Sequence, residues 1–197
     1  MNRRTVVTLG LAVAVGPVAK RAAFAQTGQT GSQVTAYAFS FPALSGDAIT
    51  LASYIGRPLL VVNTASQCSY TPQYAGLQEL WDEFRERGLV VIGVPCNDFG
   101  GKEPGGPTEI SETAHQYGVT FPIAAKTIVV GHNAHPFYRW AAAARPKDAP
   151  RWNFHKYLIG RDGYIADVFP PAVEPTNMKV KKAVAHTLAH TRSATAN

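Results

Sequence analysis

The sequence predicts an α/β fold in which a central mixed sheet of about four main strands is flanked by helices. Two apolar runs, residues 59–63 and 89–94, lie on either side of an amphipathic segment, residues 72–87. This β-α-β order predicts two parallel strands joined by a right-handed crossover. Residues 156–159 and 164–169 flank a turn and predict an antiparallel hairpin, which makes the sheet mixed. A chain of 197 residues with 46% apolar content can form one such domain with a substantial core.

An N-terminal β-hairpin is predicted ahead of this sheet. Residues 37–41 alternate in the manner of an edge strand, and residues 48–51 contain the returning strand. The intervening Ser45-Gly46-Asp47 is typical of a turn.

The helix at residues 72–87 has clear start and stop signals. Pro72 is favoured at a first helical position because its missing N–H is not needed there. Gly88 can end the helix in a left-handed conformation. One face carries apolar side chains at steps of one, three and four residues, namely Leu77, Leu80, Trp81 and Phe84.

Three further helices are expected, near residues 108–117, 136–144 and 175–190. The last of them carries an apolar stripe that would cover one face of the sheet. Residues 97–106 contain too many glycines for regular structure. Because ligands usually bind at loops that leave parallel strands, we expect this loop to border a functional site.

Cys68 lies at the junction between the first parallel strand and its helix. Unpaired N–H groups and the positive end of the helix dipole favour a thiolate there, and the thiolate is the reactive form of cysteine. Free cysteine is more often a small buried hydrophobic residue. The position of Cys68 alone therefore leaves both a catalytic and a packing role open.

The cysteines and the charge argue against several classes of function. Cys68 and Cys96 form no Cys-x-x-Cys motif and lack the Cys/His spacing of a metal site, so we expect no dithiol oxidoreductase, no metal and no cofactor. Beyond residue 25 the chain has 15 basic and 13 acidic residues, because four of the 19 basic ones lie before that point. This balance predicts no nucleic-acid partner.

Residues 1–25 have the pattern of an export signal peptide. Asn2-Arg3-Arg4 is basic, a weakly apolar stretch follows, and Ala23-Phe24-Ala25 fits a cleavage site. The paired arginines and the basic Lys20-Arg21 favour the twin-arginine route over the Sec route. We predict a cleaved, exported, periplasmic protein without stable membrane insertion after cleavage. An uncleaved N-terminal anchor is the alternative.

The remaining chain divides simply. Residues 26–33 are Gly, Ser, Thr and Gln and predict a flexible linker. Residues 34–191 form the expected domain, and residues 192–197 a disordered tail.

Three motifs of this domain resemble signatures of the glutathione peroxidase family, a group with the thioredoxin-like fold. The first comprises Asn63-Thr64-Ala65-Ser66-Gln67-Cys68 and Thr71-Pro72-Gln73-Tyr74. The second comprises Val94-Pro95-Cys96-Asn97-Asp98-Phe99-Gly100 and Glu103-Pro104-Gly105. The third is Trp152-Asn153-Phe154-His155-Lys156-Tyr157-Leu158. The three motifs follow one another in the order of the family.

The resemblance implies that Cys68 is the peroxidatic residue, at a position where some members carry selenocysteine. It also implies that Trp152 and Asn153 are its hydrogen-bonding partners, although by residue type alone Trp152 could be a core residue and Asn153 a turn residue. A thiolate can attack a hydroperoxide to leave water or an alcohol and a sulfenic acid. Indole and carboxamide N–H groups can stabilise the anion without competing as nucleophiles.

Lys102 departs from the family pattern, because members usually have a glutamine there. An ammonium group near Cys68 would favour the thiolate, but a thiol of lowered pKa is intrinsically less nucleophilic. A solvated position on the surface is the alternative for so flexible a side chain.

A second departure concerns the recycling of Cys68. Many cysteine-type members have a resolving cysteine at the position that Ala114 occupies here. The resemblance gives Cys96 a packing role at the end of a strand. We therefore expect glutathione or another thiol reductant to restore Cys68.

Two classes of function follow. The first is a thiol-dependent peroxidase that reduces hydrogen peroxide or organic hydroperoxides through a Cys68 sulfenic acid. The second is a redox sensor or thiol-relay protein that is oxidised at Cys68 with little turnover. The short stretch between Pro136 and Trp152 resembles members without an oligomerisation insert, which implies a monomer.

Overall fold

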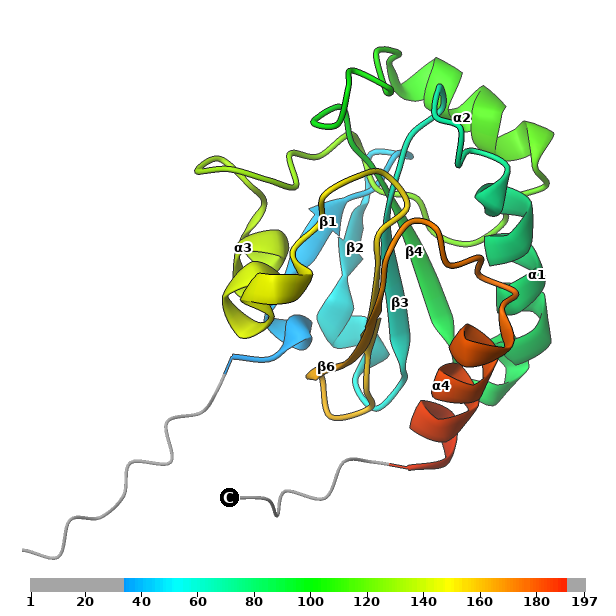
Figure 1. The fold of residues 1–197 in the computed structure, drawn as a ribbon, viewed down its shortest axis with the longest axis vertical. Coiled ribbons are helices and arrows are strands. Elements are labelled where there is room, and N and C mark those ends of the chain that lie inside the picture. Colours follow the sequence, from blue (N-terminus) through cyan, green and yellow to red (C-terminus); the bar gives the residue numbers. More distant parts are fainter. Residues whose placement is uncertain (1–33, 191–197) are drawn as a thin grey trace, which may run out of the picture. The chain divides into compact units, whose positions relative to one another are not determined.

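The computed structural model describes residues 34–190 (Figure 1). The predicted signal peptide at 1–25, the linker at 26–33 and the tail at 192–197 lie outside these residues. Within the described part, a four-stranded sheet is flanked by helices, and a separate two-stranded hairpin precedes it. Among residues 34–190, no helix is both long and apolar enough to cross a lipid bilayer.

The predicted mixed sheet is confirmed. Its strands are β3 (Leu59–Thr64), β4 (Val90–Pro95), β5 (Lys156–Ile159) and β6 (Ile165–Phe169), in the order β4-β3-β5-β6. β3 and β4 are parallel, whereas β5 is antiparallel to both β3 and β6. All residues of β3, β4 and β5 are buried, as expected for strands that are covered on both faces.

The predicted hairpin is present, but it starts later than expected. β1 (Ser40–Pro42) pairs with β2 (Ala48–Thr50), whereas Ala36–Ala38 form a 3-10 turn in place of the predicted strand. The cause is tertiary, because the Tyr37 hydroxyl lies 3.1 Å from the Arg57 carbonyl and 3.0 Å from the Arg161 carbonyl. Hydrogen bonds to these carbonyls, which are distant in the sequence, hold Tyr37 in the 3-10 turn and not in a strand.

The helices agree with the sequence within a few residues at each end. They are α1 (Gln73–Phe84), α2 (Pro107–Gln116), α3 (Pro136–Ala144) and α4 (Met178–Ala189), with 3-10 turns at Leu51–Tyr54, Arg85–Arg87 and Pro146–Asp148. Pro72 lies at the N-cap position, one residue before the first helical position that the sequence predicted for it, and makes no side-chain capping bond. Gly88 has a φ of 113°, the left-handed conformation predicted for a stop after the helix.

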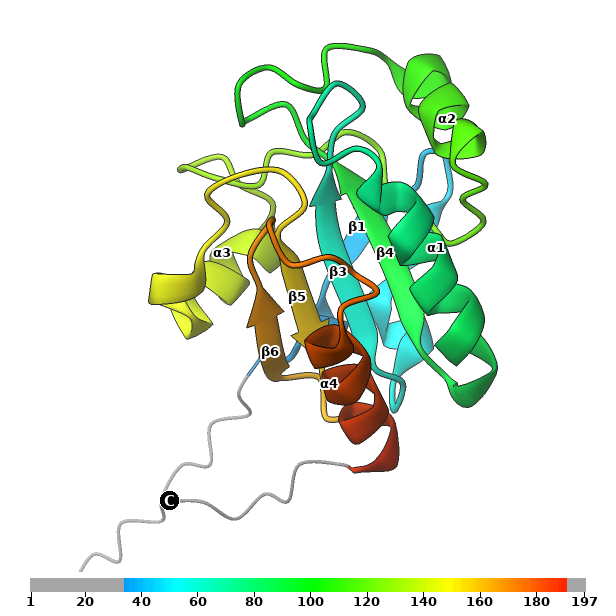
Figure 2. The ribbon, with the colours of Figure 1, turned by 45° about the vertical axis from the view of Figure 1, so that its right-hand side comes forward.

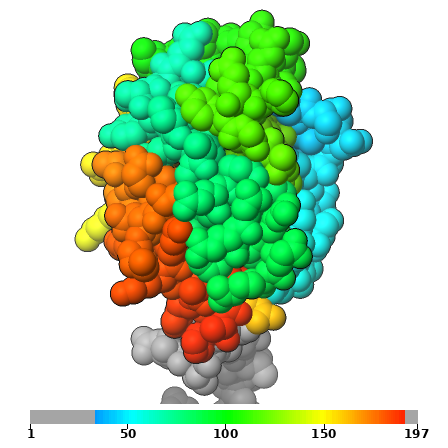
Figure 3. Space-filling model, turned by 90° about the vertical axis from the view of Figure 1, so that its right-hand side faces the viewer, coloured from blue at the N-terminus to red at the C-terminus, as the bar shows by residue number. Residues whose placement is uncertain are grey.

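The sheet separates two apolar layers. Figure 2 shows α1 and α4 on one side of the sheet and α3 on the other. Alternate residues of β3 point to opposite sides, so that Leu60 and Val62 pack with α1 and α4, while Leu59 and Val61 pack with α3 and the hairpin. The α1 and α4 side forms a continuous outer surface (Figure 3). There the Lys181 ammonium joins the two helices, 3.2 Å from Glu79 Oε1 and 2.7 Å from Glu83 Oε2.

Candidate active site

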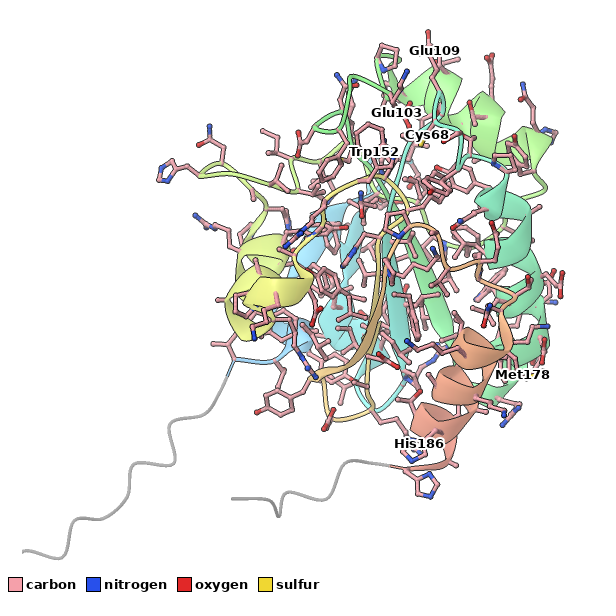
Figure 4. The ribbon with its side chains drawn as sticks, viewed as in Figure 1. Cys68, Glu103, Glu109, Trp152, Met178 and His186 are labelled. Atoms are coloured by element: carbon pink, nitrogen blue, oxygen red, sulfur yellow. The ribbon has the colours of Figure 1, made fainter. Side chains whose placement is uncertain are left out.

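The topology brings the three sequence motifs to one end of the sheet. Cys68 follows the carboxyl end of β3, and the glycine-rich loop follows the same end of the parallel strand β4. Trp152 and Asn153 precede β5, and because β5 is antiparallel to β3, they lie at that end as well. Figure 4 shows Cys68, Glu103 and Trp152 close together there.

Cys68 lies in a tight turn that Thr71 organises from its side chain. The Cys68 N–H donates to Thr71 Oγ1 over 3.0 Å, and Oγ1 is 2.8 Å from the Ala65 carbonyl. The Thr71 N–H donates in turn to the Cys68 carbonyl over 3.0 Å. Cys68 is 9% exposed, and the Tyr70 N–H donates to its sulfur over 3.5 Å. A main-chain donor therefore faces the sulfur of a residue that is almost fully buried.

Trp152 and Asn153 differ in burial. Trp152 is 39% exposed, with its ring centroid 6.3 Å from that of Phe99. Asn153 is fully buried, and its Nδ2 donates to the Phe99 carbonyl over 3.3 Å. Gly100, at a φ of 67°, leaves room for the indole, because a Cβ there would be 3.3 Å from the Trp152 ring. Among residues 34–190, neither Trp152 nor Asn153 hydrogen-bonds to the Cys68 sulfur.

Lys102 is tied to the Cys68 turn by its main chain. Its carbonyl accepts a hydrogen bond from the Gln67 N–H over 2.9 Å. Its aliphatic stem passes close to Gly100, at which a Cβ would lie 3.8 Å from both Cγ and Cε of Lys102. In the part of the chain that is described, the Lys102 ammonium makes no hydrogen bond or ion pair, with Cys68 or with any other residue.

Glu103 is a fully buried carboxyl group beneath this turn, and sequence analysis assigned it no role. Its Oε2 accepts from the Ser66 hydroxyl over 3.1 Å, and its N–H donates to Asn97 Oδ1 over 2.8 Å. Burial raises the pKa of Glu103 above its ordinary value of 4.5, against the opposing effects of the Ser66 hydrogen bonds and the Lys126 charge. The sequence signal for a role of Glu103 was that it is the only glutamate among residues 97–106. Glu103 and Ser66 thus join the first and second motifs.

Cys96 and Cys68 lie in different environments, because they belong to apolar layers on opposite faces of the sheet. Both are free. Burial raises the pKa of Cys96 to about 12, although the Asp98 N–H donates to its sulfur over 3.3 Å. Cys96 is therefore an unreactive thiol at neutral pH.

The surface hollow near α2 lies away from the predicted site residues. A hollow of about 770 Å³ between the hairpin turn and α2 is lined by Leu44, Ser45 and helix residues such as Ser111 and His115, and by none of the predicted site residues. Within residues 34–190, no group of three or more His, Cys, Asp and Glu side chains is arranged to hold a metal ion.

Comparisons with known proteins agree with this arrangement. The family model described as glutathione peroxidase matches residues 36–142. The hydroperoxy fatty acid reductase gpx1 of Synechocystis is 44% identical over 151 residues, covering 72% of this chain and 89% of that protein. The crystal structure of Trgpx in its apo form matches with a TM-score of 0.66 and 31% identity, over 81% of this chain and 98% of that chain.

A more distant structural match identifies the fold class. A thiol:disulfide interchange protein of the thioredoxin family, from Chlorobium tepidum, matches with a TM-score of 0.60 over 76% of this chain and 92% of that chain. At 15% identity, this likeness concerns the fold alone. The described domain has the thioredoxin-like fold that the sequence predicted.

The buried Glu103 carboxyl gives a prediction for stability. A raised pKa means that the native state binds the Glu103 proton more tightly than the unfolded state, so this group favours folding least at high pH. Glu103→Gln keeps an oxygen that can accept from Ser66 but cannot ionise. We expect the variant to melt close to the parent at pH 4 and at a higher temperature than the parent at pH 8. Thermal unfolding from pH 4 to pH 8 measures the difference in melting temperature between the variant and the parent. A difference that becomes smaller as the pH rises would contradict the prediction.

Proposed function

The chain belongs to the glutathione peroxidase family and is a thiol-dependent peroxidase, and we propose that Cys68 is the residue that the peroxide oxidises. One observation carries this assignment: Cys68 lies in a turn before α1, at the sheet end where Trp152 and Asn153 also lie. The 9% of Cys68 that remains exposed is the proposed point of approach for a peroxide. The Tyr70 N–H stabilises negative charge on that sulfur.

The proposed first half-reaction is a displacement at oxygen. The Cys68 thiolate attacks the distal oxygen of the hydroperoxide, an S–O bond forms, and the O–O bond breaks. The sulfur is oxidised to a sulfenic acid, and the leaving alkoxide or hydroxide takes up a proton to become an alcohol or water. The name of the Synechocystis relative refers to hydroperoxy fatty acids, which supports organic hydroperoxides as well as hydrogen peroxide as substrates.

Trp152 and Asn153 are proposed to orient the peroxide and to stabilise the developing charge. Both carry N–H donors on rigid planar groups, which suits an anion that develops during the reaction. The partial exposure of Trp152 supports a contact with substrate, whereas the burial of Asn153 supports a fixed position. The Lys102 ammonium, at the position of the family's glutamine, is proposed to approach the sulfur and to favour the thiolate.

The second half-reaction is proposed to use an external thiol. One thiol condenses with the sulfenic acid to form a mixed disulfide and water, and a second thiol displaces Cys68 as a thiolate. Cys96 lies in the opposite layer, and α2 has Ala114 where many family members have a resolving cysteine, which supports an intermolecular reductant. Glutathione is the proposed small reductant, with another thiol, including that of a thioredoxin, as the alternative.

A redox sensor is the second candidate, because Lys102 departs from the family residue. The two functions differ in turnover. Purified protein with excess hydrogen peroxide and either glutathione or thioredoxin should consume many equivalents of peroxide if it is a peroxidase. Consumption that stops at one equivalent per protein would favour the sensor.

We also propose that the mature protein is a monomer in the periplasm. The short segment between Pro136 and Trp152, which includes α3, supports the monomer. The paired Arg3-Arg4 and the Ala23-Phe24-Ala25 sequence support export by the twin-arginine route.

The two cysteines should respond differently to substitution. Cys68→Ser should abolish peroxide reduction, whereas Cys96→Ser should retain most of the rate, because only Cys68 lies at the proposed site. Peroxide consumption with glutathione measures both. Equal losses, together with a Cys68–Cys96 disulfide detected by mass spectrometry after oxidation, would make Cys96 the resolving residue.

Lys102→Gln tests the proposed contact with the sulfur. Removing a positive charge near a thiolate should lower the thiolate fraction of Cys68 at neutral pH and slow its alkylation by iodoacetamide. Lys147→Gln, at an exposed position in a 3-10 turn, makes the same charge change as a control. An alkylation rate that is equal in the parent and both variants would mean that the Lys102 ammonium stays in solvent.

Export can be tested directly from the N-terminus. Mature protein from the periplasm should begin near Gln26, and replacing Arg3-Arg4 by two lysines should leave the precursor in the cytoplasm, because the twin-arginine route requires the arginine pair. N-terminal sequencing of each fraction measures both. If cells with the parent sequence contain only unprocessed protein, the assignment of a cleaved export signal is wrong.

A further inference from the structure

The turn that carries Trp152 and Asn153 ends in a strained residue. Phe154 has a φ of 65° and is the only residue other than glycine with a positive φ among residues 34–190. A left-handed conformation costs a bulky residue free energy and persists only where its surroundings impose it. The contacts of Phe154 therefore determine how the preceding two residues are aimed.

Asn63 at the end of β3 holds this turn from one side. Its carbonyl accepts from the Phe154 N–H over 2.6 Å, and its Nδ2 donates to the Trp152 carbonyl over 3.0 Å. Its own N–H donates to the His155 carbonyl over 3.3 Å. These bonds satisfy two of the turn's carbonyls and one N–H, but they leave the Phe154 carbonyl to another donor.

Lys156 supplies that donor. Its Nζ lies 2.8 Å from the Phe154 carbonyl, and the whole side chain is buried in a strand that is otherwise apolar or aromatic. Burial lowers the pKa of Lys156 to about 7, against the weaker opposing effect of the Glu174 carboxylate. The amine can donate to the carbonyl in either protonation state. Burying a lysine is costly, and an apolar residue would suit this layer better.

We propose that Lys156 is a positioning residue for the peroxidase site, because its amine holds the Phe154 carbonyl and so fixes the left-handed turn that aims Trp152 and Asn153. This inference rests on the proposed roles of those two residues. Lys156 itself touches no substrate. It acts through the backbone of Phe154, and Asn63 restrains the same turn from β3.

Lys156→Met tests the proposal, because methionine fills similar space without a donor. The rate at which hydrogen peroxide oxidises Cys68 should fall about tenfold, since small displacements of positioned groups have effects of this order. Leu158→Ala is the matched control, because Leu158 lies two residues along β5, is also fully buried and faces the same layer. It should lower the melting temperature and leave the oxidation rate within about twofold, as expected for a site away from the turn.

A double-mutant cycle separates positioning from general destabilisation. If Lys156 acts through Trp152 and Asn153, Lys156→Met should cost less rate in an Asn153→Ala background than in the parent, because one of the two positioned residues is already absent. Lys156→Arg, which keeps an N–H donor, should recover most of the rate. If Lys156→Met does not fold, Lys156→Gln replaces it. The shorter glutamine side chain places its N–H donor farther from the Phe154 carbonyl.

The outcomes also separate this proposal from the proposed function. Parent protein that fails to oxidise Cys68 with peroxide would refute the peroxidase assignment at this residue. Parent protein that reacts normally, together with a Lys156→Met variant of equal rate, would refute the positioning role alone. The positioning role would also be refuted if the rate losses of Lys156→Met and Asn153→Ala multiplied in the double variant. It would be refuted too if Leu158→Ala lowered the oxidation rate as much as Lys156→Met does at an equal loss of stability.

Discussion

The main-chain pairing at the carboxyl end of β3 is the interaction on which the site depends. The Asn63 carbonyl accepts from the Phe154 N–H on one side, and the Thr64 carbonyl accepts from the Cys96 N–H over 2.9 Å on the other. Adjacent residues of one strand thus hold the chain segments on both sides, while the strand itself continues towards Cys68. Three segments that are far apart in the sequence are therefore fixed relative to one another by backbone bonds, which only a substitution by proline would remove directly.

Buried polar groups beneath this strand end have a cost in stability that the rest of the fold must offset. Glu103 and Lys156 are fully buried, and burial moves the pKa of each in the direction that disfavours its charge. Both hydrogen-bond to motif segments, Glu103 to Ser66 and Lys156 to Phe154. Polar groups kept in an apolar layer at such a cost are expected where a precise geometry matters more than stability.

The sheet also divides the thiol chemistry. Cys68 belongs to the layer of α1 and α4, whereas Cys96 belongs to the layer of α3 and the hairpin. A disulfide between them would require one of the two segments to move, because the thiols belong to different apolar layers. The backbone pairing that holds the segments of both cysteines thus leaves Cys96 in the layer opposite to that of Cys68.

The sequence by itself determined the order of the main strands and helices, the mixed sheet, and the turn that carries Cys68. Those features depend on local signals such as apolar periodicity, Pro72 and Gly88, and on three motifs that identify a family. Only the tertiary structure decided which residues support the site. The Tyr37 turn, the Ser66–Glu103 bond, the Phe154 conformation and the separation of the two thiols all depend on contacts between segments distant in the chain. Local patterns carry no information on such contacts, because burial and hydrogen-bond partners exist only once the strands have paired.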